Sequence, residues 1–296
     1  MHKNFIIITG ASGFIGHAFY RYLDKKVSNK TIVLIDKSSK VKLISKSNRN
    51  KIVLIQSNTY YIESKLKNYK NQIDSLFHFG EFSRIVRSFE KVELNFSSNT
   101  LSTFKVINFC SKNNIKLIYS ASSSIFGNNK QDSNLSPYSW TKSKNIELIK
   151  NYSDWFGLKY EIVYFYNVYG EGQPRNTKMS AVIGIFEGQY LKNRPLTIRG
   201  EGKQKRDFTH IYDIVRGTYL AWKKNLNLEY MICSKRKKSI IQIAKLFKHK
   251  YTFIEELSSE RLSSSYSNNN SEKYLKFRAK IRIEDYIKKF LQNHKK

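Results

Sequence analysis

The sequence predicts an α/β protein built on a doubly wound parallel sheet and completed by a smaller C-terminal α/β lobe. Short apolar runs alternate with amphipathic segments from the first residues onward, and a glycine-rich turn joins the first run to the first amphipathic segment. Apolar runs without internal alternation are typical of strands that are buried on both faces of a sheet. With 296 residues, of which 40% are hydrophobic, the chain can bury a large core, which excludes a disordered polycation.

Strands and helices are expected to alternate through the first half of the chain. Apolar runs of strand length occupy residues 5–9, 31–35, 52–55, 76–79, 116–120 and 160–166. Amphipathic stretches of helical length occupy residues 14–25, 60–69, 96–113 and 138–156. After Gly170 the pattern predicts a helix near 179–191, a strand near 196–198, a helix near 211–223 and a flexible Ser/Asn-rich loop at 258–271.

A glycine-rich turn follows the first strand and opens the first helix. Its candidate binding residues are Gly10, Ser12, Gly13, Phe14, Ile15 and Gly16. Glycine is needed where a Cβ atom would clash with a phosphate or with the packed helix, and the free N–H groups at the helix start attract an anion. Asp36 ends the second strand, where a carboxylate can accept both ribose hydroxyls. The segment predicts a dinucleotide site, and Asp36 favours NAD over NADP, although the neighbouring Lys37 weakens that preference.

A Tyr and a Lys four residues apart lie on one helical face, and the chain contains several such pairs. Context selects Tyr138 and Lys142, because they open the helix that follows the fifth strand, whose end carries Ser122 in a cluster of serines. The C-terminal end of a parallel strand faces the crevice where a dinucleotide lies. We expect Tyr138 to act as the acid/base, Lys142 to favour its ionised form and to bind the ribose, and Ser122 to orient the substrate.

The glycine spacing, three residues and then three, resembles that of the extended short-chain dehydrogenase/reductase family, in particular its nucleotide-sugar epimerase/dehydratase branch. The resemblance runs from Met1 to about Asp213. It implies further cofactor contacts at Phe79 and Gly80 after the fourth strand, at Asn99 in the next helix, and at Asn58, where family members carry Asp.

The same resemblance implies the substrate contacts. Ser122 and Ser123 would bind the sugar, Asn167 would bind the diphosphate or the sugar, and the guanidinium of Arg206 would clamp the diphosphate. One departure lies beside these residues, because Gly80 and Glu81 stand where the family carries two small residues.

The residues after Ser122 bear on the type of reaction. Dehydratases of this branch carry an Asp–Glu pair there and decarboxylases carry a Glu, whereas this chain has Ser123 and Ser124. Without that acid, elimination lacks its proton donor. The resemblance therefore implies NAD-dependent epimerisation of a nucleotide-diphosphate sugar, expected to be a UDP-hexose at C4, through a transient 4-keto intermediate, for surface polysaccharide synthesis. A 4-keto reductase, a 4,6-dehydratase and a dinucleotide-sensing regulator that binds nucleic acid are the alternatives.

The formal net charge of +30 comes from 53 Lys and Arg against 23 Asp and Glu. Clustered cations would indicate nucleic-acid or membrane binding, but here they are scattered, and the densest run is residues 235–238. The chain is rich in Lys and Asn and poor in Ala, a bias that A/T-rich codons produce. We interpret the charge as compositional drift on an enzyme with a diphosphate substrate, and nucleic-acid binding is not expected.

We expect residues 1–168 to form a Rossmann-type NAD-binding domain to which residues 207–228 return. Residues 169–296 are then expected to form a compact substrate-binding lobe. The resemblance also implies a homodimer joined through the helices at 96–113 and 138–156.

Compartment and metal content follow from what the sequence lacks. Cys110 and Cys233 have no Cys or His at ligand spacing, so neither a metal site nor a disulfide framework is predicted. No apolar run reaches 18 residues, and no signal segment precedes the first strand. We therefore expect a cytoplasmic protein without a membrane span.

Overall fold

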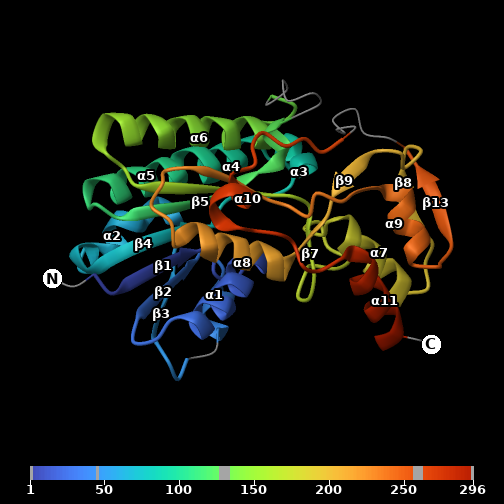
Figure 1. The fold of residues 1–296 in the computed structure, drawn as a ribbon, viewed down its shortest axis with the longest axis horizontal. Helices are drawn as coiled ribbons and strands as arrows, with labels where there is room; N and C mark the ends of the chain where they lie inside the picture. The colour runs from blue at the N-terminus through green and yellow to red at the C-terminus, as the bar shows by residue number, and fades with distance from the viewer. Residues whose placement is uncertain (1–2, 45–46, 127–133, 256–262, 295–296) are drawn as a thin grey trace.

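The computed structural model describes residues 3–44, 47–126, 134–255 and 263–294 (Figure 1). Its centre is a seven-stranded sheet of order β11–β6–β5–β4–β1–β2–β3, in which all neighbouring strands are parallel. The strands are β1 (Phe5–Thr9), β2 (Thr31–Asp36), β3 (Lys51–Gln56), β4 (Ile73–His78), β5 (Lys116–Ser122), β6 (Tyr160–Phe165) and β11 (Glu229–Ile232). The strand order reverses between β1 and β4, which opens a crevice at their C-terminal ends. The predicted doubly wound parallel sheet is confirmed.

Helices cover both faces of this sheet (Figure 1). α1 (Phe14–Lys26) and α8 (Ile211–Trp222) pack on one face, and α2 (Ile62–Leu66), α5 (Ser102–Lys112) and α6 (Pro137–Phe156) contribute to the core on the other. Successive side chains of a strand point to opposite faces, so Ile6 and Ile8 enter one core while Ile7 enters the other. A continuous apolar run therefore supplies two cores at once, which explains the composition of the strands.

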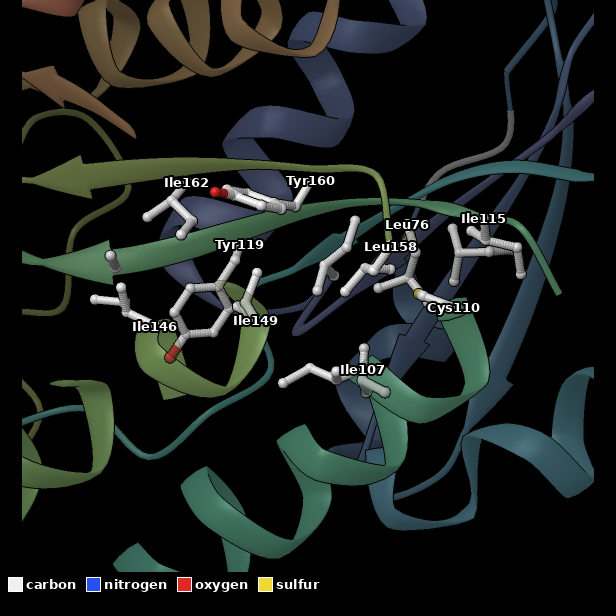
Figure 2. Packing of buried hydrophobic residues seen from close by; sticks show 14 of the residues in the cluster. Leu76, Ile107, Cys110, Ile115, Tyr119, Ile146, Ile149, Leu158, Tyr160 and Ile162 are labelled. Carbon is white, nitrogen blue, oxygen red and sulfur yellow. The ribbon is translucent and has the colours of Figure 1, made fainter. Parts of the chain in front are cut away.

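In the core beneath α5 and α6, side chains of the two helices pack directly against side chains of the sheet. Tyr119 of β5 and Ile162 of β6 meet Ile146 and Ile149 of α6, and Ile107 of α5 lies beside them (Figure 2). All five side chains are at most 5% exposed. This packing fixes α6 against β5 and β6, and it thereby fixes the start of α6 near the crevice.

The segment between β4 and β5 differs from the single helix predicted at 96–113. It comprises α3 (Ile85–Glu90), α4 (Val92–Phe96), a π-helical turn (Ser97–Leu101) and α5. Ser102 Oγ donates to Ser97 O over 2.9 Å, and Asn145 Nδ2 donates to Asn99 O over 2.6 Å. These side chains donate to carbonyls that the wider π-helical turn leaves without their usual partners. The spacing of hydrophobic residues alone does not reveal such a turn.

Short helical turns supplement the sheet. They are η1 (Ser39–Leu43), η2 (Thr59–Tyr61), η3 (Lys70–Gln72) and η5 (Ser123–Phe126). The helix predicted at 60–69 is reduced to η2 and the five residues of α2. Among the described residues, no helix has both the length and the apolar character needed to cross a membrane.

The C-terminal lobe has its own apolar core. Its elements are β7 (Val168–Tyr169), α7 (Val182–Leu191), β8 (Leu196–Arg199), β9 (Lys205–Asp207), β10 (Thr209–His210), β12 (Lys237–Ser239), α9 (Ile240–Leu246), β13 (Tyr251–Ile254) and α11 (Ile283–Asn293). The strands form three separate pairs, β7 with β10, β8 with β13, and β9 with β12. Phe186, Phe247 and Phe290 pack between α7, α9 and α11, which holds the lobe together.

The return of the chain to the first domain is longer than predicted. α8 packs on α1 as expected, but β11 then extends the sheet, and α10 (Asn270–Leu275) packs on both α8 and β11. The predicted return at 207–228 therefore ends before the last strand of the sheet. Strand β11 is only four residues long, which explains why its apolar run is hard to recognise in the sequence.

The flexible loop predicted at 258–271 is corrected over its second half, while residues 258–262 lie outside the described residues. Ser264 is fully buried, and its Oγ accepts a hydrogen bond from Asp207 N over 3.0 Å. Tyr266 donates to Asp207 Oδ2 over 2.8 Å. Composition suggested a flexible segment because it does not show that these hydroxyls bond the backbone and the carboxylate of the buried Asp207.

Candidate active site

The turn between β1 and α1 is tight because glycine stands at its two closest contacts. Gly10 has φ +65°, and a Cβ atom there would lie 2.8 Å from Gly80 N. A Cβ atom on Gly16 would lie 2.1 Å from Gly10 O. No side chain caps the start of α1 at Gly13, so the first N–H groups of this helix are left to bind an anion.

Asp36 ends β2, and Asn58 lies two residues after the end of β3. Asp36 accepts hydrogen bonds from Ser12 N over 3.0 Å and from Ser38 N over 2.9 Å, so its carboxylate is fixed beside the glycine turn. Asn58 Oδ1 accepts from Tyr60 N over 2.9 Å and thereby caps the turn that follows β3. Both residues belong to the lining of one cleft.

One cleft of about 1900 Å³ joins the two halves of the predicted site. It extends from the glycine turn, over the C-terminal ends of the parallel strands, to residues of the C-terminal lobe. The predicted site residues that line it are Gly10, Ser12, Gly13, Phe14, Ile15, Gly16, Asp36, Asn58, Phe79, Gly80, Ser122, Ser123, Tyr138, Lys142 and Asn167. The topology therefore brings the predicted cofactor and catalytic residues to a single cavity.

The start of α6 positions Tyr138. Ser136 caps the helix by accepting from Ser139 N over 3.1 Å, and Pro137 occupies the first turn, where its missing N–H does no harm. Tyr138 N also donates to Ser88 Oγ over 3.2 Å, which ties this helix start to α3. Tyr138 and Lys142, one helical turn apart, face the same cleft as Ser122 at the end of β5.

A buried carboxylate stands beside this set, and the sequence prediction did not assign it a role. Glu81 Oε2 forms an ion pair with Lys142 Nζ, and the two side chains are only 2% and 5% exposed. Lys142 Nζ also donates to Ser120 O and lies 4.8 Å from the centre of the Tyr119 ring. The only signal in the sequence was that Glu81 replaces a small residue of the related family.

Arg84 was also not predicted to belong to the site. It lines the cleft with φ +114°, a backbone conformation that side-chain-bearing residues rarely adopt. Its Nε donates to Met179 O over 2.7 Å, and its Nη2 donates to the same oxygen. Burial lowers the pKa of Arg84, and the negative charge of an ionised Tyr138 opposes that shift.

Two predicted contacts do not reach the cleft. Asn99 is fully buried, because its Oδ1 accepts from Phe82 N over 2.6 Å and its Nδ2 donates to Phe82 O over 3.1 Å. The Asn99 amide thus holds the segment after β4 in place, and a direct contact of Asn99 with the cofactor stays a prediction. Arg206 lies on β9, outside the described lining of the cleft, and Arg199 and Lys178 line the cleft from the C-terminal lobe instead. Whether Arg206 binds the diphosphate stays a prediction.

Asn167 lies where the chain leaves the sheet for the C-terminal lobe. Its φ of +26° is in the left-handed region, which Asn tolerates better than most residues. Its Nδ2 donates to Asp207 O over 3.0 Å, so the predicted Asn turn and the segment that carries Arg206 and Asp207 are joined. Fully buried Asp207 also accepts from Ser234 N over 2.9 Å, which stiffens this border of the cleft.

The cysteines take no part in the cleft. Cys110 and Cys233 are buried and free, and burial raises the pKa of both thiols. In the part of the chain that the structure describes, no three His, Cys, Asp or Glu side chains are grouped to hold a metal ion.

Comparisons with known proteins agree with the geometry. A family model described as "NAD dependent epimerase/dehydratase family" matches residues 6–233. A curated relative, a putative UDP-glucose 4-epimerase of Methanocaldococcus jannaschii, is 27% identical over 84% of this chain and 83% of its own length.

Two solved structures illustrate the range of activities that the fold supports. A UDP-N-acetylglucosamine 4-epimerase from Methanobrevibacter ruminantium superposes with a TM-score of 0.88 at 22% identity, over 99% of this chain and 98% of its own. The dTDP-glucose 4,6-dehydratase DesIV from Streptomyces venezuelae, solved with NAD bound, superposes with a TM-score of 0.86 at 17% identity, over 98% of this chain and 97% of its own. At these identities the two structures show a shared fold.

Proposed function

Because the chain belongs to the NAD-dependent epimerase/dehydratase family, we propose that it epimerises a nucleotide-diphosphate sugar at C4 through a transient 4-keto sugar. The observation that carries this proposal is the single cleft shared by the glycine turn and by Ser122, Tyr138 and Lys142. The proposed substrate is a UDP-hexose, in line with the name of the Methanocaldococcus jannaschii relative, and the proposed role is surface polysaccharide synthesis.

The residues of the cleft fit NAD. The close approach of Gly10 to Gly80 leaves no room for a Cβ atom at Gly10, and the uncapped start of α1 offers N–H groups to a pyrophosphate. The Asp36 carboxylate stands where it can accept the hydroxyls of the adenosine ribose. When bound, NAD supplies a site that takes up a hydride from the sugar and gives it back.

The side chains then supply the proton chemistry. Ionised Tyr138 is proposed to take the proton of the C4 hydroxyl and to return it at the end of the reaction. Ser122 Oγ is proposed to hold the same sugar oxygen, and Lys142 to bind a ribose hydroxyl with the N–H that Glu81 and Ser120 leave free. Inversion requires the 4-keto sugar to turn over within the cleft before it is reduced from its other face.

The dehydratase alternative lacks a suitable acid. Ser123 and Ser124, which replace the acid pair of the dehydratases, are both buried residues of the cleft wall. Glu81 is a carboxylate in the same cleft, but it is paired with Lys142 and accepts three further hydrogen bonds. In all of these contacts the Glu81 oxygens act as acceptors, so the carboxylate is engaged away from a leaving hydroxyl. Epimerisation is therefore favoured over elimination.

A 4-keto reductase would use the same Ser/Tyr/Lys set. The two activities differ in stoichiometry, because a reductase consumes reduced cofactor at every turnover and an epimerase returns the hydride to the same sugar. Incubating the protein with a panel of nucleotide sugars without added cofactor, and following the products by NMR, separates the two. An epimerised product supports the proposal, and conversion only when reduced cofactor is added contradicts it.

The site makes one substitution decisive. Tyr138→Phe removes the acid/base oxygen and leaves the glycine turn intact, so interconversion should fall by a factor of about 100 or more while NAD stays bound. Rates measured by NMR and NAD content measured after denaturation check both parts. Tyr152→Phe, on the same helix but outside the cleft lining, is the matched control and should keep its rate. Undiminished turnover in Tyr138→Phe would overturn the assignment.

We further propose that the protein is a homodimer joined across α4, α5 and α6. Phe96 of α4 stacks on Trp140 of α6 with ring centroids 5.2 Å apart. Leu101 and Phe104 continue this apolar area and are 54% and 38% exposed. Large exposed apolar areas of this kind mark association surfaces on soluble proteins.

A further inference from the structure

Two guanidinium groups of the cleft wall contact the same residue of the C-terminal lobe. Arg84 Nε donates to Met179 O over 2.7 Å, and Arg84 Nη2 donates to the same oxygen. Arg87 Nη1 donates to Met179 Sδ over 2.9 Å. All three residues line the cleft. Because both side chains reach one methionine, the two positive charges are held together on one patch of the wall.

Neither of these positive charges is offset by a carboxylate of the protein. In the described ranges of the chain, no Asp or Glu oxygen lies within ion-pair distance of either guanidinium. The acidic residues that line the cleft are Asp36, Glu81, Glu90 and Glu171. The backbone of the glycine turn holds Asp36, while Glu81 and Glu171 contact Lys142 and His210. None of these three carboxylates is therefore left for the arginines.

Two exposed charges belong to the same part of the wall. Glu90 ends α3, and Lys178 precedes Met179 on its loop. Neither forms an ion pair among the residues that the structure describes. Their charges are opposite in sign and screened by solvent, so together they add little to the local field. The excess positive charge of this wall is that of the two arginines.

The contacts with Met179 leave N–H groups of both arginines without an acceptor. A guanidinium carries five N–H donors, and a thioether is only a weak acceptor. Arg87 Nε is buried and has no hydrogen-bond partner in the described part of the chain. Buried donors without partners cost free energy. Such a patch is typical of a site whose acceptor arrives with a ligand.

Hydrogen bonds join this patch to the helix start that carries Tyr138. Ser88 follows Arg87 in α3, and its Oγ accepts from Tyr138 N over 3.2 Å. Ser88 N donates to Arg84 O over 3.2 Å, so the turn that presents both arginines is tied to the start of α6. The sugar is proposed to react at Tyr138. An anion bound on this patch therefore belongs to the sugar end of the substrate.

We propose that Arg84 and Arg87 form a subsite for an acidic group on the sugar, so that the substrate is a nucleotide-diphosphate hexuronate. A carboxylate is planar and can accept two parallel N–H bonds from a guanidinium. Excess cations in a concave cleft attract such an anion more strongly than cations on a flat surface. This inference rests on the proposed function and narrows its substrate from a UDP-hexose to one whose sugar is an acid.

Binding of three ligands that differ only in the sugar tests the subsite. Calorimetric titrations with UDP-glucuronate, UDP-glucose and UDP are made on the full chain with NAD bound and with Tyr138→Phe, which prevents turnover. UDP-glucuronate should bind at least about tenfold more tightly than UDP-glucose. Adding Arg84→Met or Arg87→Met should weaken UDP-glucuronate by about tenfold or more and change the other two affinities by less than about threefold.

Arg194→Met is the matched control, because Arg194 is exposed and lies outside the described lining of the cleft. It should leave all three affinities unchanged. Equal losses for all three ligands in Arg84→Met and Arg87→Met would show that the arginines bind the diphosphate, which overturns the proposal. An unchanged affinity for UDP-glucuronate would also overturn it and leave both side chains with the structural role of holding Met179.

Conservative variants separate charge from packing. Arg84→Lys and Arg87→Lys keep the positive charge but lose the planar fork, so each should retain more affinity for UDP-glucuronate than its Met counterpart. Equal affinities of the Lys and Met variants would contradict recognition by charge. Circular dichroism checks the fold, and if Arg84→Met does not fold, Arg87→Met and Arg87→Lys decide.

The outcomes also separate this inference from the proposed function. Failure of every nucleotide sugar to react would contradict epimerisation without affecting the titrations. Epimerisation of UDP-glucose by a protein that does not prefer UDP-glucuronate would contradict only the acidic subsite.

Discussion

His78 shows how a single buried side chain links the glycine turn to the catalytic side of the cleft. Its Nδ1 lies 2.7 Å from Thr9 Oγ1, and its Nε2 lies 3.0 Å from Thr103 Oγ1. Thr103 donates in turn to Glu81, so Nε2 carries the proton and Nδ1 accepts from Thr9. Protonation of Nδ1 would remove the hydrogen bond that it accepts from Thr9 at the end of β1.

The lowered pKa of His78 predicts a pH dependence of stability. The unfolded state binds the proton near pH 6.5, whereas the folded state binds it only near a pKa of about 4. The contribution of His78 to the free energy of unfolding is therefore fully present above about pH 6.5. It should fall by about 3 kcal/mol as the pH approaches 4. Urea unfolding at a series of pH values measures the slope.

The matched variants are His78→Gln, which should lose that slope between about pH 6.5 and 4, and His249→Gln at a half-buried position, which should keep it. An unchanged slope in His78→Gln would assign the acid sensitivity to other groups.

At the residue scale, the sequence was sufficient for residues that can be recognised from their immediate neighbours in the chain. Gly10, Gly16 and Tyr138 could be recognised because their neighbours in the chain define a turn or a helix start. The roles of Glu81 and Asn99 could not be recognised, because Glu81 is held by Tyr119 of β5 and Asn99 is held by Phe82 in the loop after β4. A buried carboxylate and a surface carboxylate look the same until the fold shows which donors surround them.

At the element scale, the glycine turn predicts different effects for two of its positions. Gly16→Ala would place a Cβ atom 2.1 Å from Gly10 O, whereas Gly13→Ala would place one at 3.2 Å from the same oxygen. The first overlap forces the turn apart, so NAD affinity should fall at least about tenfold and thermal stability should fall with it.

Gly13→Ala is the comparison for that variant, and it should keep the melting temperature of the unliganded protein within a few degrees. Calorimetric titration with NAD and thermal unfolding measure the two effects. Equal melting temperatures for both variants would show that the turn tolerates the side chain.

The elements themselves could be predicted where length and pattern agree. α1, α6 and α8 follow their predicted ranges closely, because each has a long apolar face or a clear capping signal. α3 was not predicted, since its six residues carry Val86 and Phe89 exposed to solvent. Hydrophobic periodicity reports burial within one chain, and it fails where an apolar face is turned outward.

At the scale of the whole molecule, the exposed apolar area predicts an assembly. Leu101→Asp combined with Phe104→Asp should shift the protein from dimer to monomer in sedimentation equilibrium, because two charges would be buried without partners. Leu226→Asp is the control, at a position that is 45% exposed and lies outside α4, α5 and α6. A wild-type protein that is monomeric at all concentrations tested would contradict the dimer.

Part of the net charge of +30 is concentrated in the lining of the cleft. Within the described lining of the cleft, ten Lys and Arg residues face four Asp and Glu residues. An excess of cations in a concave site attracts anions and accelerates their binding. Part of a charge that we interpreted as compositional drift is therefore concentrated where an anionic substrate is proposed to enter.

The position of β11 in the sheet has a consequence for synthesis of the chain. Until residues 229–232 leave the ribosome, β6 is an edge strand, although all six of its residues are buried in the finished protein. An exposed, apolar edge strand readily pairs with another chain. The first 165 residues therefore lack the strand that covers this edge, and a nascent chain of that length exposes a surface that favours aggregation.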